Sequence, residues 1–167
     1  MKIDLTQDKT LLIDDIYCDL IAQHKWCAQK HRNTYYAVTN VRKNRKNCRI
    51  FVHRLIIENF IGRKLNKEEQ IDHIDGDGLN NKLLNLRLCT SQQQQFNQRK
   101  STKRKFTSKY KGVSWDKRAK KWLVCITKSG KTTRLGYFDN EEDAALAYNN
   151  AAKKYFGNFC NLNGIGV

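Results

Sequence analysis

An adjacent aspartate and histidine, Asp72 and His73, form the part of this sequence best suited to chemistry. They begin a short acidic segment that also holds Asp75 and Asp77, inside a chain with a net charge of +16. Phosphodiester hydrolysis needs a metal ion at the scissile phosphate and a base that takes a proton from the attacking water. A carboxylate suits the first task and a near-neutral histidine the second. The segment therefore favours a metal-dependent nuclease, although a solvated turn also produces such a pattern.

The elements that must position this pair are predicted from periodicity and from turn residues. Residues 53–61 have apolar side chains at helical spacing and end at Gly62, which predicts a short helix. Residues 70–85 are rich in Gly, Asp and Asn, which predicts a loop rather than a packed element. In that loop Asp75, Asp77, Asn80 and Asn81 are expected to shape the turns. Residues 89–100 carry Thr90 or Ser91 as a possible N-cap before a polar run, consistent with a solvent-facing helix.

The first fifty residues alternate apolar and polar positions in short runs, which predicts a twisted antiparallel sheet. The expected strands are 10–14, 25–29, 35–41 and 49–52, with turns at 31–33 and 43–47.

A second strand-rich region follows a basic linker at residues 101–108, where we place the domain boundary. Three strands are predicted, at 110–115, 122–127 and 132–138. A helix is expected to begin at an Asp139 N-cap, with Glu142 completing a capping box, and to end at Gly157. Its apolar side is expected to comprise Ala145, Tyr148, Ala152 and Tyr155, packed on the sheet face that carries Trp122, Val124 and Ile126. The fold class is therefore α+β.

Composition points to an anionic partner. Lys and Arg number 32 against 16 Asp and Glu, which indicates a nucleic acid or a membrane surface. The apolar stretches are too short to span a bilayer, and the first residues are unlike a signal peptide, so we expect a soluble protein of the cytoplasm of a bacterial or phage-infected cell. The six cysteines are dispersed without a CxxC pair, so we expect no zinc site and assign them as mostly small buried hydrophobes.

The residues around the acidic segment resemble the phage and intron-associated branch of the HNH nucleases. The resemblance rests on His53-Arg54-Leu55, Asp72-His73-Ile74-Asp75-Gly76, Asn80-Asn81, Asn85-Leu86-Arg87 and Thr90-Ser91. It covers about residues 10–100 with the β-rich lead-in, and the domain predicted from it is 1–100, with a core at 51–100. It implies a ββα-metal finger that holds one Mg²⁺ or Mn²⁺ ion, with Asp72 as a metal ligand and His73 as the general base. Asn85 would then be the asparagine that braces the loop of His73.

One position departs from this pattern. The family carries a second metal ligand, His or Asn, nine residues after the bracing asparagine, and here that position is Gln94. A glutamine offers the same amide oxygen on a longer arm. Asn97, one helical turn further on, is the fallback ligand. This departure leaves open whether the module cleaves DNA.

The second region resembles the AP2 DNA-binding domain over residues 109–164. The resemblance rests on Tyr110-Lys111-Gly112-Val113, Lys121-Trp122, Leu135-Gly136-Tyr137-Phe138, Ala144-Ala145, Ala147-Tyr148, Ala151-Ala152 and Asn161-Leu162-Asn163. It implies a three-stranded sheet that lies in the major groove of duplex DNA. Arg134 and Arg118 are candidates for bidentate contacts to guanine, and Trp122 is expected in the core.

The predicted DNA-contacting residues fall into three groups. Arg54 contacts a phosphate or stabilises the nuclease module. The linker residues track the backbone or enter a minor groove, unless the linker is freely solvated; they are Arg99, Lys103, Arg104 and Lys105. The AP2-like region supplies Lys111, Ser114, Asp116, Lys117, Arg118, Lys121, Cys125, Thr127, Thr132, Arg134 and Tyr137, with the lysines at phosphates.

These patterns predict a site-directed, homing-type DNA endonuclease that acts on double-stranded DNA as a monomer, without a nucleotide cofactor. The main alternative is a DNA-binding regulator whose HNH module no longer cleaves. An RNA-binding protein is a third possibility, disfavoured because the sequence has no aromatic RNA-stacking signature.

Overall fold

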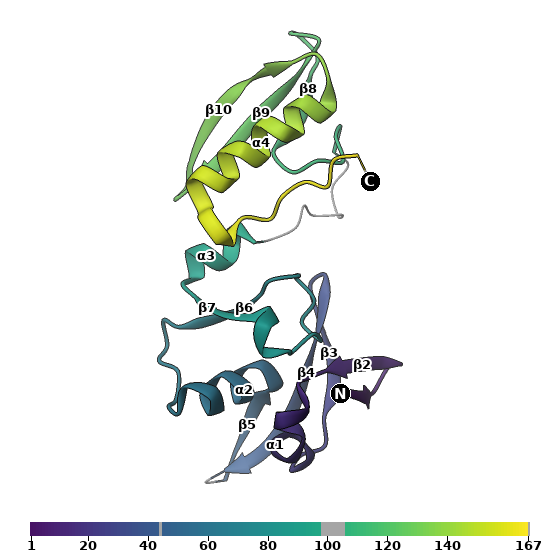
Figure 1. The fold of residues 1–167 in the computed structure, drawn as a ribbon, viewed down its shortest axis with the longest axis vertical. Helices are drawn as coiled ribbons and strands as arrows, with labels where there is room; N and C mark the ends of the chain where they lie inside the picture. Colours follow the sequence, from purple (N-terminus) through teal and green to yellow (C-terminus); the bar gives the residue numbers. More distant parts are fainter. Residues whose placement is uncertain (44, 98–105, 167) are drawn as a thin grey trace. The chain divides into compact units, whose positions relative to one another are not determined.

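The computed structural model describes residues 1–43, 45–97 and 106–166. The chain divides into two compact units, Met1–Gln94 and Gln95–Val167. Both combine helices with small antiparallel sheets (Figure 1), which confirms the predicted α+β class. The linker residues Arg99, Lys103, Arg104 and Lys105 lie outside the described part of the chain, so their predicted contacts, like the predicted linker, stay predictions.

The first unit is built on a three-stranded sheet that precedes a helix. Strands β3 (Cys27–His31), β4 (Thr34–Lys43) and β5 (Lys46–Phe51) pair antiparallel in the order β3-β4-β5. Three of the four predicted strands thus form an antiparallel sheet, as predicted, whereas the first, at 10–14, is wrong in its partner, because residues 9–12 pair with residues 2–5 in a separate hairpin. The pairing of β4 with β5 reaches Lys43 and Lys46, inside the segment 43–47 that was predicted as a turn. The helix α2 (Val52–Ile61) follows at once and ends at Gly62, whose φ of 70° is a left-handed conformation that glycine adopts without strain.

The N-terminal residues supply much of the core of this unit. They form the hairpin β1 (Lys2–Leu5) and β2 (Lys9–Leu12), the 3-10 helix η1 (Asp15–Tyr17) and the short helix α1 (Cys18–Ala22). Leu11, Ile13 and Ile21 are almost completely buried and pack with Val52 and Ile56 of α2. The apolar face of α2 is therefore held by residues some forty positions earlier.

A second hairpin in this unit corrects one prediction. Residues 70–85 are not a loop throughout, because Gln70–His73 forms strand β6. β6 pairs antiparallel with β7 (Leu86–Cys89), which follows the 3-10 helix η2 (Leu83–Asn85). Because Ile71, Asp72 and His73 are all buried, the strand lacks the apolar–polar alternation by which half-buried strands are recognised. The helix α3 (Ser91–Phe96) comes directly after the hairpin.

The second unit is a three-stranded sheet with one helix across one face (Figure 1). Its strands are β8 (Val113–Asp116), β9 (Lys121–Lys128) and β10 (Lys131–Phe138), in the order β10-β9-β8. The helix α4 (Glu141–Phe156) ends at Gly157 as predicted, and the 3-10 helix η3 (Gly157–Phe159) follows. Val124 and Ile126 pack with the alanines of α4, and Trp122 joins this core, as predicted.

Three details of the predictions are wrong. The N-cap of α4 is Asn140 rather than Asp139, because the Asn140 side chain accepts from the amides of Glu142 (2.7 Å) and Asp143 (3.4 Å). Tyr155 is 39% exposed, and Phe156 takes the buried position at the end of the helix. The cysteines are not mostly buried: all six have free thiols, and Cys89 alone among them is buried. No helix among the described residues is long and apolar enough to cross a membrane.

Candidate active site and DNA-binding face

The β6–β7 hairpin places the acidic residue of the predicted site against a basic one. Asp72 and Arg87 are register partners on the two strands. Arg87 donates from Nε (2.9 Å) and from Nη2 (2.6 Å) to Oδ2 of Asp72. Both side chains are largely buried, at 7% exposure for Asp72 and 16% for Arg87. The carboxylate of Asp72 is therefore held by two hydrogen bonds from the partner strand of its own hairpin.

The next residue, His73, lies buried in a cluster of rings. Its ring centroid is 5.2 Å from that of His53 and 5.8 Å from that of Tyr36. Burial lowers the pKa of His73, although Asn81 and the nearby carboxylates oppose this shift. Burial, with the neighbouring His73 and Arg54, also lowers the pKa of His53, to about 3. Both imidazoles are therefore neutral at physiological pH.

Asn81 fixes one side of the His73 ring. Its Nδ2 donates to the carbonyl of Gly78 (3.1 Å), which directs Oδ1 toward Nε2 of His73 at 3.4 Å. The asparagine is fully buried, and its own amide donates to the carbonyl of Leu12 (2.7 Å). Because an amide oxygen only accepts, this contact favours a proton on Nε2 of His73 and leaves Nδ1 as the basic nitrogen of the neutral ring.

The loop after His73 is held together around Asn85 and Asp75. Asn85 Nδ2 donates to Asp75 Oδ1 (3.0 Å) and to the Asn80 carbonyl (2.7 Å), and its Oδ1 accepts from the Asp75 amide (3.1 Å). Asp75 and Asp77 in turn accept from the amides two residues on, at 2.8 and 3.0 Å. These hydrogen bonds connect the two ends of the loop that begins at His73 and stabilise its conformation.

The helix α3 brings Gln94 to the strand that carries Asp72. The helix starts with a capping box, in which Thr90 Oγ1 accepts from the Gln93 amide (3.3 Å) and Gln93 Oε1 accepts from the Thr90 amide (2.8 Å). Gln94 Nε2 donates to the carbonyl of Ile71, one residue before Asp72, at 3.4 Å. The fallback ligand Asn97 is buried and belongs to the second unit, and its role as a ligand stays a prediction.

The side-chain oxygens of Asp72 on β6 and Gln94 on α3 are donors of a kind that fits a hard divalent cation. A carboxylate and an amide oxygen are ligands that Mg²⁺ and Mn²⁺ accept, and Mg²⁺ often keeps one or two protein ligands with waters or phosphate oxygens. Among the described residues no group of three or more His, Cys, Asp or Glu gathers as a metal cluster.

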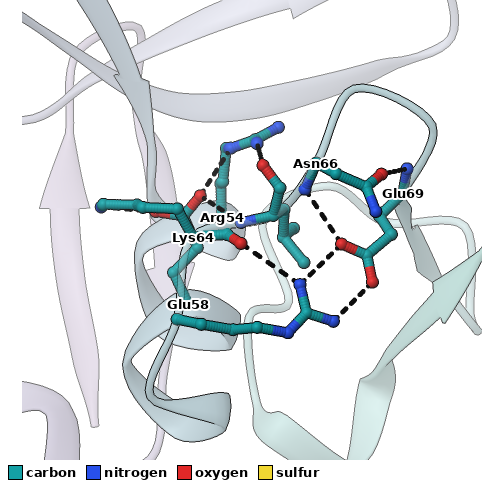
Figure 2. Close-up of polar contacts among 7 residues, drawn as sticks. Arg54, Glu58, Lys64, Asn66 and Glu69 are labelled. Atoms are coloured by element: carbon teal, nitrogen blue, oxygen red, sulfur yellow. Dashed lines mark hydrogen bonds and ion pairs between the residues drawn. The ribbon is translucent and has the colours of Figure 1, made fainter.

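Arg54 lies in a polar cluster formed by α2 and the segment that joins α2 to β6 (Figure 2). Its Nε donates to Glu58 Oε1 (2.9 Å) and its Nη2 to the Leu65 carbonyl (2.9 Å). Lys64 pairs with the other oxygen of Glu58 (2.6 Å), and Arg63 makes a two-pronged pair with Glu69 (2.6 and 2.8 Å). Of the two roles predicted for Arg54, these contacts serve the stabilising one.

The face of the second unit that α4 leaves uncovered carries most of the predicted base contacts. Arg134 lies over the ring of Tyr137 (5.6 Å to the centroid), and the hydroxyl of Tyr137 donates to Asp116 (3.2 Å). Thr127 and Thr132 share a hydrogen bond (2.8 Å) on the same face. Ser114, Lys117 and Arg118 are exposed at its edge, and Cys125 is half-buried between the strands.

Two of the lysines predicted to contact phosphates have partners within the protein. Lys111 is half-buried, its Nζ donates to the carbonyl of Phe96 (2.9 Å), and burial lowers its pKa to about 8. Lys121 pairs with Asp139 (3.0 Å) at the sheet edge. The indole of Trp115, by contrast, is partly exposed and meets Trp122 edge to face at 5.0 Å.

Sequence reasoning missed Tyr36 and gave Asn81 only a loop-forming role. Tyr36 lies on β4, far from the motif in sequence, and only the tertiary fold brings it to His73. A signal for Asn81 did exist, since two adjacent asparagines follow the Asp-His pair.

Comparisons with known proteins match both regions of the chain. The family model described as HNH endonuclease matches residues 51–96, and the AP2 domain model matches residues 108–158. An uncharacterized HNH endonuclease of Acanthamoeba polyphaga mimivirus is 34% identical over 114 residues, which are 68% of this chain and 57% of that protein. Protein 3.8 of Escherichia phage T7 is 43% identical over 78 residues, 47% of this chain and 63% of that protein.

The AP2 part also has plant relatives. An AP2-like ethylene-responsive transcription factor of Arabidopsis thaliana is 42% identical over 62 residues, 37% of this chain and 20% of that protein. The chain thus spans less than two thirds of the length of each of these relatives. No solved structure matches it significantly. Residues 51–96 of this chain are an HNH endonuclease domain, and residues 108–158 are an AP2 domain.

Proposed function

We propose that this protein is a site-directed DNA endonuclease of the homing type. The observation that carries the proposal is the buried His73, whose ring contacts Asn81 and His53 and which directly follows Asp72 on a hairpin strand. A neutral, oriented imidazole beside a carboxylate is the pair that metal-assisted hydrolysis needs.

In this proposal Nδ1 of His73 takes the proton from the attacking water. The lowered pKa of His73 favours this role, because the ring is unprotonated at pH 7 and available as a base. Asp72 and the amide oxygen of Gln94 are the proposed ligands of one Mg²⁺ or Mn²⁺ ion, which when bound neutralises charge on the phosphate and stabilises the leaving 3′-oxygen. Asn85 keeps the loop of His73 in shape through Asp75 and Asn80.

The uncovered face of the AP2 domain is the proposed reader of double-stranded DNA. Arg134 carries the fork of donors that guanine accepts, and its stacking on Tyr137 restricts the guanidinium before binding. Replacing Arg134 by Ala should weaken binding to the target duplex about 10- to 100-fold and relax its sequence preference. Replacing Lys111 by Ala should lower the melting temperature of the domain instead, since its ammonium contacts Phe96.

A plasmid nicking assay tests the nuclease proposal. Supercoiled DNA from the protein's own source is incubated with Mg²⁺ or Mn²⁺, with and without EDTA. We expect relaxed or linear product that disappears with EDTA and with His73→Ala. Cleavage that survives EDTA would reject the metal-dependent mechanism.

The second candidate, a DNA-binding regulator with a non-cleaving HNH module, is favoured by the Gln94 position. The side chain of Gln94 is longer than that of the Asn found at this position in the family pattern, so its amide oxygen is shifted relative to the position of the expected ligand atom. The Gln94→Asn variant separates the candidates in the same assay. Cutting that begins only with Gln94→Asn would support the regulator, and cutting by the unchanged protein would reject it.

A further inference from the structure

One aromatic residue outside the HNH segment contacts the histidines of the site. Tyr36 lies on β4, fifteen positions before the segment of residues 51–96 that matches the HNH family begins. Its ring centroid is 5.3 Å from that of His53 and 5.8 Å from that of His73, and it meets Phe51 edge to face at 6.1 Å. The imidazole of His73 is thus bounded by Tyr36 and His53 as well as by Asn81.

The loop of the active site is shaped around this ring. A side chain at Gly78 would place its Cβ 2.6 Å from the ring of Tyr36 and even closer to the carbonyl of Tyr35. The amide of Gly78 donates to Thr34 Oγ1 (2.9 Å), so a side chain of strand β4 contacts the backbone of the loop after His73. Asn81, which is hydrogen-bonded to the Gly78 carbonyl, completes the connection from β4 to Nε2 of His73.

We infer that Tyr36 is a positioning residue for His73, so the β-rich lead-in is part of the active site. Asn81 contacts one ring nitrogen of His73, and the rings of Tyr36 and His53 pack against the imidazole. Together these contacts restrict the tilt of the imidazole, and misplacing a proton acceptor by about 1 Å costs up to about 100-fold in rate. This inference rests on the proposed function, because it needs His73 to be the base.

Tyr36 contacts the histidines through its ring, so the variants are chosen to remove the ring or to keep it. Tyr36→Leu removes the aromatic ring, and Tyr36→Phe keeps the ring and removes only the hydroxyl. Tyr36→Met is the substitute if the leucine variant does not fold, because Met fills irregular gaps. Tyr35→Leu is the matched control: Tyr35 lies on the opposite face of β4, under Lys9 and packed on the core of the unit.

The experiment measures the single-turnover cleavage rate, the DNA dissociation constant and the melting temperature of each variant. We expect Tyr36→Leu to cleave about 10- to 100-fold more slowly with an unchanged dissociation constant. Tyr36→Phe should restore the rate, and Tyr35→Leu should lower the melting temperature alone. In a His73→Ala background, Tyr36→Leu should cause no further loss, since a residue that acts through His73 has nothing left to orient.

Several outcomes would overturn the inference. They are a Tyr36→Leu rate equal to that of the unchanged protein, an equal loss in the His73→Ala background, or a loss that lies wholly in DNA affinity. A Tyr36→Phe variant as slow as Tyr36→Leu would assign the effect to the hydroxyl and reject ring packing. Cleavage that depends on His73 but not on Tyr36 rejects this inference alone, whereas a chain that cuts nothing rejects the proposed function with it.

Discussion

Arg87 donates two hydrogen bonds to one carboxylate oxygen of Asp72, across a hairpin where the two residues are register partners. Removing one partner of a buried pair leaves a desolvated charge, which costs much more than a surface pair is worth. The residue proposed to bind the metal ion is thus held by a cation of the protein itself.

This pairing predicts that Arg87→Met destabilises the first unit by about 3–5 kcal/mol in the absence of divalent ions. Added Mg²⁺ should recover part of the loss by taking over the charge of Asp72. Urea unfolding with and without Mg²⁺ measures both effects. Arg63→Met breaks an exposed pair with Glu69 and is the control, with little change expected. Equal losses for the two variants would contradict the role of burial.

Gly78 predicts a second effect on the site. A Cβ at this position would overlap the ring of Tyr36 and a backbone carbonyl, and backbone yields less easily than a side chain. Gly78→Ala should therefore cost about 1–3 kcal/mol, as overpacking generally does. Gly164→Ala, where a Cβ meets nothing within 4 Å, is the control. A Gly78→Ala protein with an unchanged unfolding free energy would show that the loop moves freely away from β4.

The sequence predicted the fold best where one face of an element is buried. The sheet of the lead-in, the helix α2 up to Gly62 and the three strands of the AP2 domain all alternate or repeat clearly. The strand β6 was not predicted, because Asp72 and His73 are polar and yet buried. The packing of Leu11, Ile13 and Ile21 in one core with the helix α2 was not predicted either. The family resemblance predicted roles for Asp72, His73 and Asn85, but the ring contact of Tyr36 depends on tertiary packing.

The cap of α4 offers a direct check on one of these corrections. Asn140 accepts the first free amides of the helix, whereas Asp139 pairs with Lys121 on the surface. Asn140→Ala should cost about 1 kcal/mol of unfolding free energy. Asp139→Ala should change it little, and thermal unfolding compares the two. A larger loss for Asp139→Ala would restore the capping box that the sequence suggested.

Acid should weaken the cluster around Glu58. Burial raises the pKa of Glu58, but hydrogen bonds from Lys64, the Leu65 amide and Arg54 outweigh this, so that its pKa lies below 4.5. Since the pKa is lowered on folding, the carboxylate stabilises the protein above about pH 4.5, and this is lost as the pH falls through the lower folded value.

Glu58→Gln should consequently be less stable than the unchanged protein at pH 7, with a gap that narrows toward pH 3. Urea unfolding at several pH values measures this gap. Glu68→Gln, at an exposed position of the same segment, is the matched control. A gap that stays constant with pH would show that the effect of Glu58 is not one of its charge.

The most direct test of the central claim is the single-turnover cleavage rate of a target duplex by the unchanged protein and by His73→Ala, with DNA affinity measured in parallel. If His73 is the general base, the rate with Mg²⁺ should fall about 10²- to 10⁴-fold while the affinity stays the same. A His73→Ala protein that binds and cleaves the duplex as fast as the unchanged one would contradict the assignment of this site.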